Sequence, residues 1–350
     1  MNSAKTVEPP PPFEPGVFEP LPWLEVHWQR LWAAHRADRL PHAVLVAGPP
    51  GIGKRHFSRL FSAALMCQRP GADGLPCGEC ADCRLVRAGT HPDLAQLGPD
   101  PEAKSDEIRV DAVREACARQ SLTAQRGPRA VLSIAPAEAM NPYAANALLK
   151  TLEEPADSTL LLLITEDPGA LPATVRSRCQ RINMLAPAAE VASPWVAERL
   201  PDSGTGADAA LLLRLAHGAP LQALRVADRQ WLEARSQTFA RLLAIAAGKE
   251  DPLSVAAAWQ HMEPALVLEW LAGWVADLIR CQASADAGIL NNPDRQAELA
   301  AIASSLSAPA LHRHLQQIMK AKAVANASIN KQLLLEALLM RWAQLTLGAR

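Results

Sequence analysis

The chain has 350 residues and a mass of 37.6 kDa, a length that predicts about two or three domains. Hydrophobic residues make up 49% of it and charged residues 20%, which is typical of a globular protein and excludes a disordered or coiled-coil chain. The net charge of −1, from 35 basic and 36 acidic residues, excludes a uniformly basic coat for nucleic acid but leaves room for a local basic patch.

The N-terminal segment is rich in proline. Residues 1–20 have too little apolar surface to bury and are predicted to form a mobile tail. They lack the basic and apolar regions of a signal peptide, and no apolar run in the chain reaches the ~18 residues of a membrane helix. We therefore expect a cytoplasmic protein, in which the seven cysteines serve as thiols or metal ligands rather than disulfides.

Strand and helix patterns alternate up to about residue 185. Helical spacing of apolar residues is found at 23–36, 55–66, 110–120 and 141–154. Short apolar runs predict strands at 42–47, 130–134 and 159–165, of which the first two are expected to be buried, and a fourth strand is predicted at 180–184. This alternation, with a glycine loop after the first strand, predicts an α/β fold built on a doubly wound parallel sheet.

The remainder of the chain is predicted to be helical. From residue 186 onward no strand pattern occurs, and breaks are expected near residues 201–206 and 248–252. The last predicted helix, at 330–347, has one apolar stripe that would pack against partner helices, made of Leu335, Leu338, Trp342 and Leu345.

A glycine-rich loop follows the first predicted strand. It fits the pattern G-x-x-x-x-G-K, in which backbone N–H groups surround a phosphate and the lysine neutralises it. The residues that would bind nucleotide are Gly48, Gly51, Gly53 and Lys54.

The ligands of a catalytic magnesium ion are missing from this loop and from the next strand that would supply one. A working site has Ser or Thr after the lysine, whereas this chain has Arg55. The strand at 130–134 ends in Ala135-Pro136 instead of an acid. The sequence thus predicts the shape of an ATPase loop without a magnesium site. Weak nucleotide binding through Lys54 stays open, as does a glycine turn kept only for packing.

Four cysteines lie in a segment rich in glycine and proline at residues 67–92, which predicts an irregular insertion. Their spacing is typical of a tetrahedral thiolate zinc site, with Cys67, Cys77, Cys80 and Cys83 as the ligands. Because sulfur would fill all four positions, the zinc would be structural rather than catalytic. An iron–sulfur cluster and four free thiols are the alternatives.

The chain resembles the clamp-loader subunits of bacterial DNA polymerase III, which are AAA+ proteins. The similar segments are RLPHAVLVAGPPGIGK (39–54), the four-cysteine insertion, AGTHPDL (88–94), IRVDAVRE (108–115), NALLKTLEEP (146–155) and LPATVRSRC (171–179). NALLKTLEEP and SRC are shared by the whole family. The damaged loop, AGTHPD and the intact cysteine set resemble its delta-prime branch. The resemblance covers about residues 20–350 and is densest at 39–185.

The resemblance implies three domains: an AAA+ (RecA-like) nucleotide-type domain at 21–185 with a zinc module at 67–92, a small helical lid at 186–230, and a helical collar at 231–350 that joins subunits. It also implies a non-hydrolysing subunit that scaffolds the ring while the sliding clamp is loaded onto primed DNA. The implied partners are the gamma or tau ATPases and delta. No intrinsic ATPase activity is expected, although such subunits are classed with DNA polymerase III through membership of the complex.

Within this resemblance, the SRC motif is Ser177-Arg178-Cys179, and Arg178 is implied to enter the ATP site of a neighbouring subunit as an arginine finger. A guanidinium is always charged and can fork two N–H groups onto phosphate. From the residues alone, Arg178 could equally cap a helix or pair with an acid. Two other functions stay open: a self-sufficient AAA+ ATPase in DNA repair or recombination, and a zinc-dependent DNA-binding module.

Overall fold

The computed structural model of the chain describes residues 14–100, 103, 105–120, 124–156, 158–200, 208–284, 286–325 and 330–348. The chain divides into two compact units, with the boundary in the sequence between Ala192 and Ser193. The N-terminal unit contains the β-sheet, and the described part of the C-terminal unit is helical.

The sheet has five parallel strands in the order β2-β3-β4-β1-β5. Their bounds are β1 (Ala43–Ala47), β2 (Leu94–Leu97), β3 (Ala130–Ile134), β4 (Thr159–Thr165) and β5 (Gln180–Asn183). Every residue of β1, β3 and β4 is buried, because helices cover both faces of the sheet. The four predicted strands are confirmed. The edge strand β2 was not predicted, although the other edge strand, β5, is equally short and more exposed.

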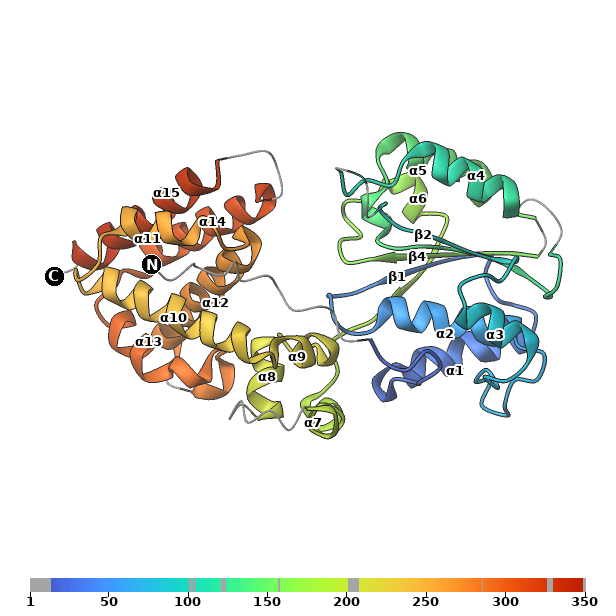
Figure 1. Cartoon of the computed structure of the whole chain (residues 1–350), viewed down its shortest axis with the longest axis horizontal. Helices are drawn as coiled ribbons and strands as arrows, with labels where there is room; N and C mark the ends of the chain where they lie inside the picture. The colour runs from blue at the N-terminus through green and yellow to red at the C-terminus, as the bar shows by residue number, and fades with distance from the viewer. Residues whose placement is uncertain are drawn as a thin grey trace. The chain divides into compact units, whose positions relative to one another are not determined.

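Helices pack on both faces of this sheet (Figure 1). One face is covered by α4 (Val110–Gln120), α5 (Pro142–Glu153) and α6 (Ala173–Arg176), and the other by α1 (Glu25–Arg36), α2 (Lys54–Met66) and α3 (Ala81–Arg87). Two short 3-10 helices, η1 (Pro22–Leu24) and η2 (Ala137–Ala139), complete the unit. The core under α4 and α5 joins Val113 and Leu148 to Leu132 and Leu161 of the strands.

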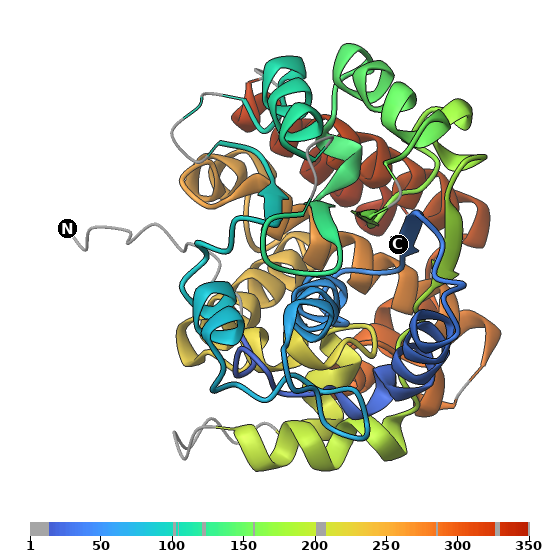
Figure 2. The same cartoon turned by 90° about the vertical axis from the view of Figure 1, so that its right-hand side faces the viewer.

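The cysteine-rich segment is more ordered than the sequence predicted. The prediction of a wholly irregular insertion at 67–92 was wrong, since α3 forms within it and packs beside α2 (Figure 2). The sulfur of Cys80 caps this helix by accepting a hydrogen bond from the backbone N–H of Cys83. The two closely spaced cysteines thus start a helical turn that apolar periodicity does not reveal.

The predicted N-terminal tail lies only partly within the described residues. Residues 1–13 are outside them. Of the rest, Phe18 lies beneath the guanidinium of Arg87, with 5.0 Å from the guanidinium carbon to the ring centre. The carbonyl oxygen of Glu19 is 2.5 Å from Nε2 of His56. This end of the segment therefore packs against α2 and α3.

The C-terminal unit consists of helices wherever the structure describes it. Helix α7 (Ala189–Arg199) spans the boundary between the units, and the helices after it are α8 (Ala209–Leu215), α9 (Pro220–Val226), α10 (Arg229–Ala246), α11 (Pro252–Trp259), α12 (Pro264–Ala283), η3 (Ala287–Ile289), η4 (Pro293–Arg295), α13 (Gln296–Ala303), α14 (Ala308–Val324) and α15 (Lys331–Leu347). The predicted break at 248–252 is confirmed: Gly248 follows α10 with a φ of 70°, and Asp251 caps α11. The break at 201–206 falls outside the described residues. No described helix is both long and apolar enough to cross a bilayer.

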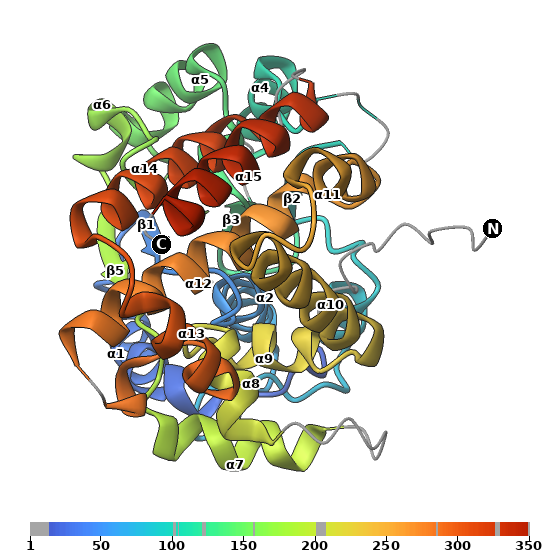
Figure 3. The same cartoon turned by 90° about the vertical axis from the view of Figure 1, so that its left-hand side faces the viewer.

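Helices α14 and α15 lie side by side in this unit (Figure 3). The predicted stripe of α15 faces inward, with Leu335, Leu338 and Trp342 buried and Leu345 half-buried. The Trp342 indole N–H donates to the carbonyl oxygen of Leu242 in α10, 3.0 Å away. The stripe therefore packs against helices of the same chain.

Candidate functional site

The glycine loop leaves the carboxyl end of β1, the edge at which parallel α/β sheets bind ligands. Gly51 and Gly53 have φ values of 72° and 93°, which favour glycine, and Gly53 is the N-cap of α2. A Cβ on Gly48 would lie 2.1 Å from the carbonyl oxygen of Met184. The loop therefore needs its glycines for backbone geometry, whether or not it binds a nucleotide.

The side chain of Lys54 is buried and contacts groups of its own chain. The residue is only 5% exposed, and its ammonium donates a 2.6 Å hydrogen bond to the carbonyl oxygen of Pro49. Its Nζ also lies 3.8 Å from Oε1 of Glu166, which directly follows β4. Burial lowers the pKa of Lys54, while the carboxylates of Glu166 and Glu138 act in the opposite direction. The charge that would neutralise a phosphate thus has partners within the protein.

The position after the lysine and the end of β3 hold no magnesium ligand, although the carboxylates of Glu138 and Glu166 lie near Lys54. Arg55 is exposed and carries no hydroxyl. The first acid after β3 is Glu138, and its Oε1 accepts a 2.8 Å hydrogen bond from the backbone N–H of Glu166. The sequence identifies Glu138 as the acid nearest to this strand end, whereas Glu166 was missed. The position of Glu166, directly after a fully buried strand, was the signal that could have found it.

The four predicted cysteine ligands are brought together by the fold. Their sulfur atoms all lie within 4.8 Å of one another, and Sγ of Cys77 is 3.9 Å from Sγ of Cys83. Zinc–sulfur bonds of about 2.3 Å in a tetrahedron place sulfurs about 3.8 Å apart, so the spacing fits. The cluster can hold a metal ion such as zinc.

Backbone donors around the cluster favour thiolates. Three N–H groups point at sulfur: Cys77 to Cys67 at 3.3 Å, Cys80 to Cys77 at 3.4 Å, and Cys83 to Cys80 at 3.4 Å. The N–H groups of Glu79 and Cys80 lower the pKa of Cys77 to about 6. Burial raises the pKa of Cys83. The pattern suits a metal, which deprotonates its thiol ligands on binding.

The residues of the motif AGTHPD link this module to the sheet. Asp82, between two of the cysteines, accepts 2.7 Å hydrogen bonds from Nε of Arg126 and from Gln68. Its Oδ1 lies 3.4 Å from Nε2 of His91, whose Nδ1 accepts from the Asp93 N–H. The Arg126 guanidinium lowers the pKa of Asp82, and burial lowers the pKa of His91. The pairing therefore joins an ionised carboxylate to a neutral imidazole.

Asp93 continues the connection toward β3. Its carboxylate accepts three backbone hydrogen bonds, from Gln125 at 2.7 Å, Arg126 at 2.8 Å and Gly127 at 2.9 Å. These residues lie in the segment that leads into β3. From the sequence alone, His91 is expected to form a turn beside Pro92 or to act as a further zinc ligand, and neither interpretation includes its contact with Asp82. The Asp-x(8)-His-x-Asp spacing gave no sign of Arg126, which is distant in the chain.

Arg178 lies just after α6 on the N-terminal unit, with 37% of its side chain exposed. One terminal nitrogen, NH1, donates to the carbonyl oxygen of Thr174 at 2.9 Å. The other, NH2, is 2.7 Å from Oε1 of Glu153, the last residue of α5. The pairing with an acid that sequence analysis left open is therefore present.

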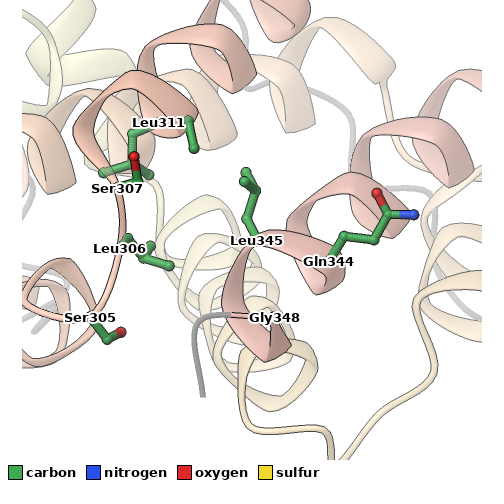
Figure 4. A pocket seen from close by; sticks show the side chains of 8 residues that line it. Ser305, Leu306, Ser307, Leu311, Gln344, Leu345 and Gly348 are labelled. Carbon is green, nitrogen blue, oxygen red and sulfur yellow. The ribbon is translucent and has the colours of Figure 1, made fainter.

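A cavity of about 350 Å³ lies in the C-terminal unit between the start of α14 and the end of α15. Leu306, Leu311 and Leu345 line it together with Ser307 and Gln344 (Figure 4). None of the predicted site residues contributes to its lining.

The fold and the loop together define a class of protein. A five-stranded parallel sheet with a phosphate-type loop after β1 is AAA+-like, and here it carries a four-cysteine cluster and precedes a helical unit. Residues 24–188 match the family described as DNA polymerase III, delta subunit. Residues 210–344 match the family described as DNA polymerase III, delta subunit, C terminal.

Relatives that align over nearly their whole length identify the family more specifically. DNA polymerase III subunit delta′ of Pseudomonas aeruginosa is 38% identical over 327 residues, which cover 93% of this chain and 97% of that protein. The subunit delta′ of Escherichia coli (strain K12) is 35% identical over 323 residues, covering 91% and 94%. The chain belongs to the family of DNA polymerase III delta′ subunits. A subunit tau/gamma of Haemophilus influenzae is 36% identical over 149 residues, 43% of this chain and 21% of that protein.

Proposed function

We propose that this chain acts in a clamp loader as a subunit that does not hydrolyse ATP. It scaffolds the ring together with tau or gamma ATPases and delta, and it supplies Arg178 to the ATP site of a neighbouring subunit. Through the complex it helps to load the sliding clamp onto primed DNA. Membership of the delta′ family and similarity to a tau/gamma subunit support this assignment.

The internal neutralisation of Lys54 is the observation that carries the proposal. In an active loop this ammonium faces the terminal phosphates and a hydroxyl beside it binds magnesium. Here it is buried against Pro49 and Glu166, and Arg55 occupies the hydroxyl position. A bound Mg·ATP would have to displace these contacts and would find no ligand from residue 55. Turnover in this chain is therefore strongly disfavoured.

Arg178 has the properties needed to act on a neighbour. Its guanidinium is partly exposed at the end of a short helix, so a second chain can reach it. The charge is permanent, and its N–H fork matches phosphate oxygens. Arginine fingers supplied in trans accelerate phosphoryl transfer by about 10³- to 10⁵-fold in other systems.

The zinc module, the lid and the collar have structural roles. Zinc held by the four cysteines would stabilise α3 and the link through Asp82 to the sheet. Residues 186–230 form the lid, and residues 231–350 form the collar through which subunits join. The sulfur ligands leave no coordination position for substrate, so the zinc takes no part in chemistry.

Two measurements test the proposal. The purified chain should show no ATP turnover above background, with or without magnesium. In a reconstituted clamp loader, Arg178→Ala should leave assembly intact and slow hydrolysis at the neighbouring site by at least about tenfold. Arg181→Ala, which removes an exposed arginine on β5, is the matched control and should leave the rate unchanged. Equal rates for the two variants would remove the finger role.

A further inference from the structure

The two most prominent motifs of the N-terminal unit meet in one ion pair. NALLKTLEEP supplies Glu153 at the end of α5, and SRC supplies Arg178 just after α6. Their atoms Oε1 and NH2 are 2.7 Å apart, and the side chains are 52% and 37% exposed. The pair joins elements that are packed against each other but separate in the sequence. Both partners therefore remain open to solvent and to another chain.

Both terminal nitrogens of Arg178 are engaged within its own chain. NH1 donates to the carbonyl oxygen of Thr174, and NH2 pairs with Glu153. Carboxylate and phosphate oxygens bind a guanidinium through the same N–H groups. A phosphate of ATP on a neighbouring subunit must therefore compete with the Glu153 carboxylate. Because exposed ion pairs are weak, the phosphates of ATP can displace the Glu153 carboxylate from Arg178.

We propose, on the basis of the proposed function, that Glu153 is a positioning residue that holds Arg178 on its own chain until nucleotide on the neighbouring subunit displaces it. The arginine exchanges a carboxylate partner for a phosphate partner. Engagement of the finger then depends on the nucleotide, and the fraction of complexes with a free finger sets the apparent affinity for ATP. The side chain of Glu154, the next residue, has no hydrogen bond or ion pair with a described residue, so only Glu153 of the motif has this role.

Steady-state ATP hydrolysis by the reconstituted clamp loader, with clamp and primed DNA, tests the exchange. Glu153→Gln keeps the size of the side chain and removes its charge. It should lower the KM for ATP about two- to fivefold, the range expected for an exposed ion pair, with kcat unchanged within about twofold. Glu154→Gln is the matched control and should leave both constants unchanged. Glu153→Gln combined with Arg178→Ala should behave as Arg178→Ala alone.

The possible failures are distinguishable. If Arg178→Ala slows hydrolysis but Glu153→Gln has the KM of Glu154→Gln or a higher one, the exchange is refuted and the finger stands. A KM decrease that persists without Arg178 also refutes the exchange, because Glu153 then acts elsewhere. If Arg178→Ala leaves hydrolysis unchanged, the finger and the exchange both fail.

Discussion

Asp93 provides a test of how the cysteine module is fixed to the sheet. The residue is 3% exposed, and its carboxylate accepts hydrogen bonds from the backbone N–H groups of three successive residues, 125–127. Asp93→Ala removes all three bonds. A hydrogen bond to a charged acceptor contributes about 1.5–3 kcal/mol to stability. Gln125 and Arg126 are exposed, so water can form hydrogen bonds with some of the N–H groups that lose the carboxylate. The variant also avoids the free-energy cost of burying a charged carboxylate. We expect a net loss of about 3 kcal/mol.

Hydrogen exchange of the β3 amides in zinc-containing buffer measures this loss, because buried strand amides exchange through opening of the whole unit. A loss of about 3 kcal/mol accelerates their exchange roughly 100-fold. Asp93→Asn should give a smaller effect, since its amide oxygen still accepts one or two of the bonds. Asp111→Ala, at a position with an 89% exposed side chain, should change exchange less than about threefold. If Asp93→Ala matched Asp111→Ala, the proposed anchoring of the module through this carboxylate would be wrong.

Two further predictions concern the metal cluster and a buried histidine. Replacing Cys77 and Cys80 by serine should release one zinc ion per chain and destabilise the N-terminal unit, because a structural metal contributes to folding; metal analysis of the wild type that finds no zinc would contradict this. His314, stacked on Trp342, has its pKa lowered to about 4 by burial, from 6.5. Since the folded state favours the neutral ring, stability present above pH 6.5 should be lost as the pH falls toward 4, by about 3 kcal/mol. Urea unfolding across this range should show the loss in the wild type and a much flatter profile in His314→Leu; parallel profiles would exclude His314 as the source.

Local sequence patterns predicted the elements whose signals lie within a few residues. The strands β1, β3 and β4 were found because both of their faces are buried, which produces uninterrupted apolar runs. The cysteine cluster was found because its ligands are close in the chain and their spacing reflects the reach of sulfur around one ion. The edge strand β2 was missed, since its four residues form no long apolar run.

Arg178 shows where local patterns stop being sufficient. Its sequence context allowed a finger, a helix cap or an ion pair, and the structure adds Glu153 as a partner. That pair depends on α5 and α6 packing together on one face of the sheet. The finger itself concerns a second chain and stays a prediction to be tested in the complex.

The sequence by itself determined that this chain has a sheet with a phosphate-type loop lacking magnesium ligands, a four-sulfur cluster and a long helical region, because each of these is encoded by residues near one another. The tertiary structure alone decided which charges meet. Lys54 lies close to Glu166 because β4 pairs with β1. Asp82 binds Arg126 because α3 lies near the segment that leads into β3. Such pairs join residues that are distant in the chain, and strand order and helix packing bring them within reach of each other's charge.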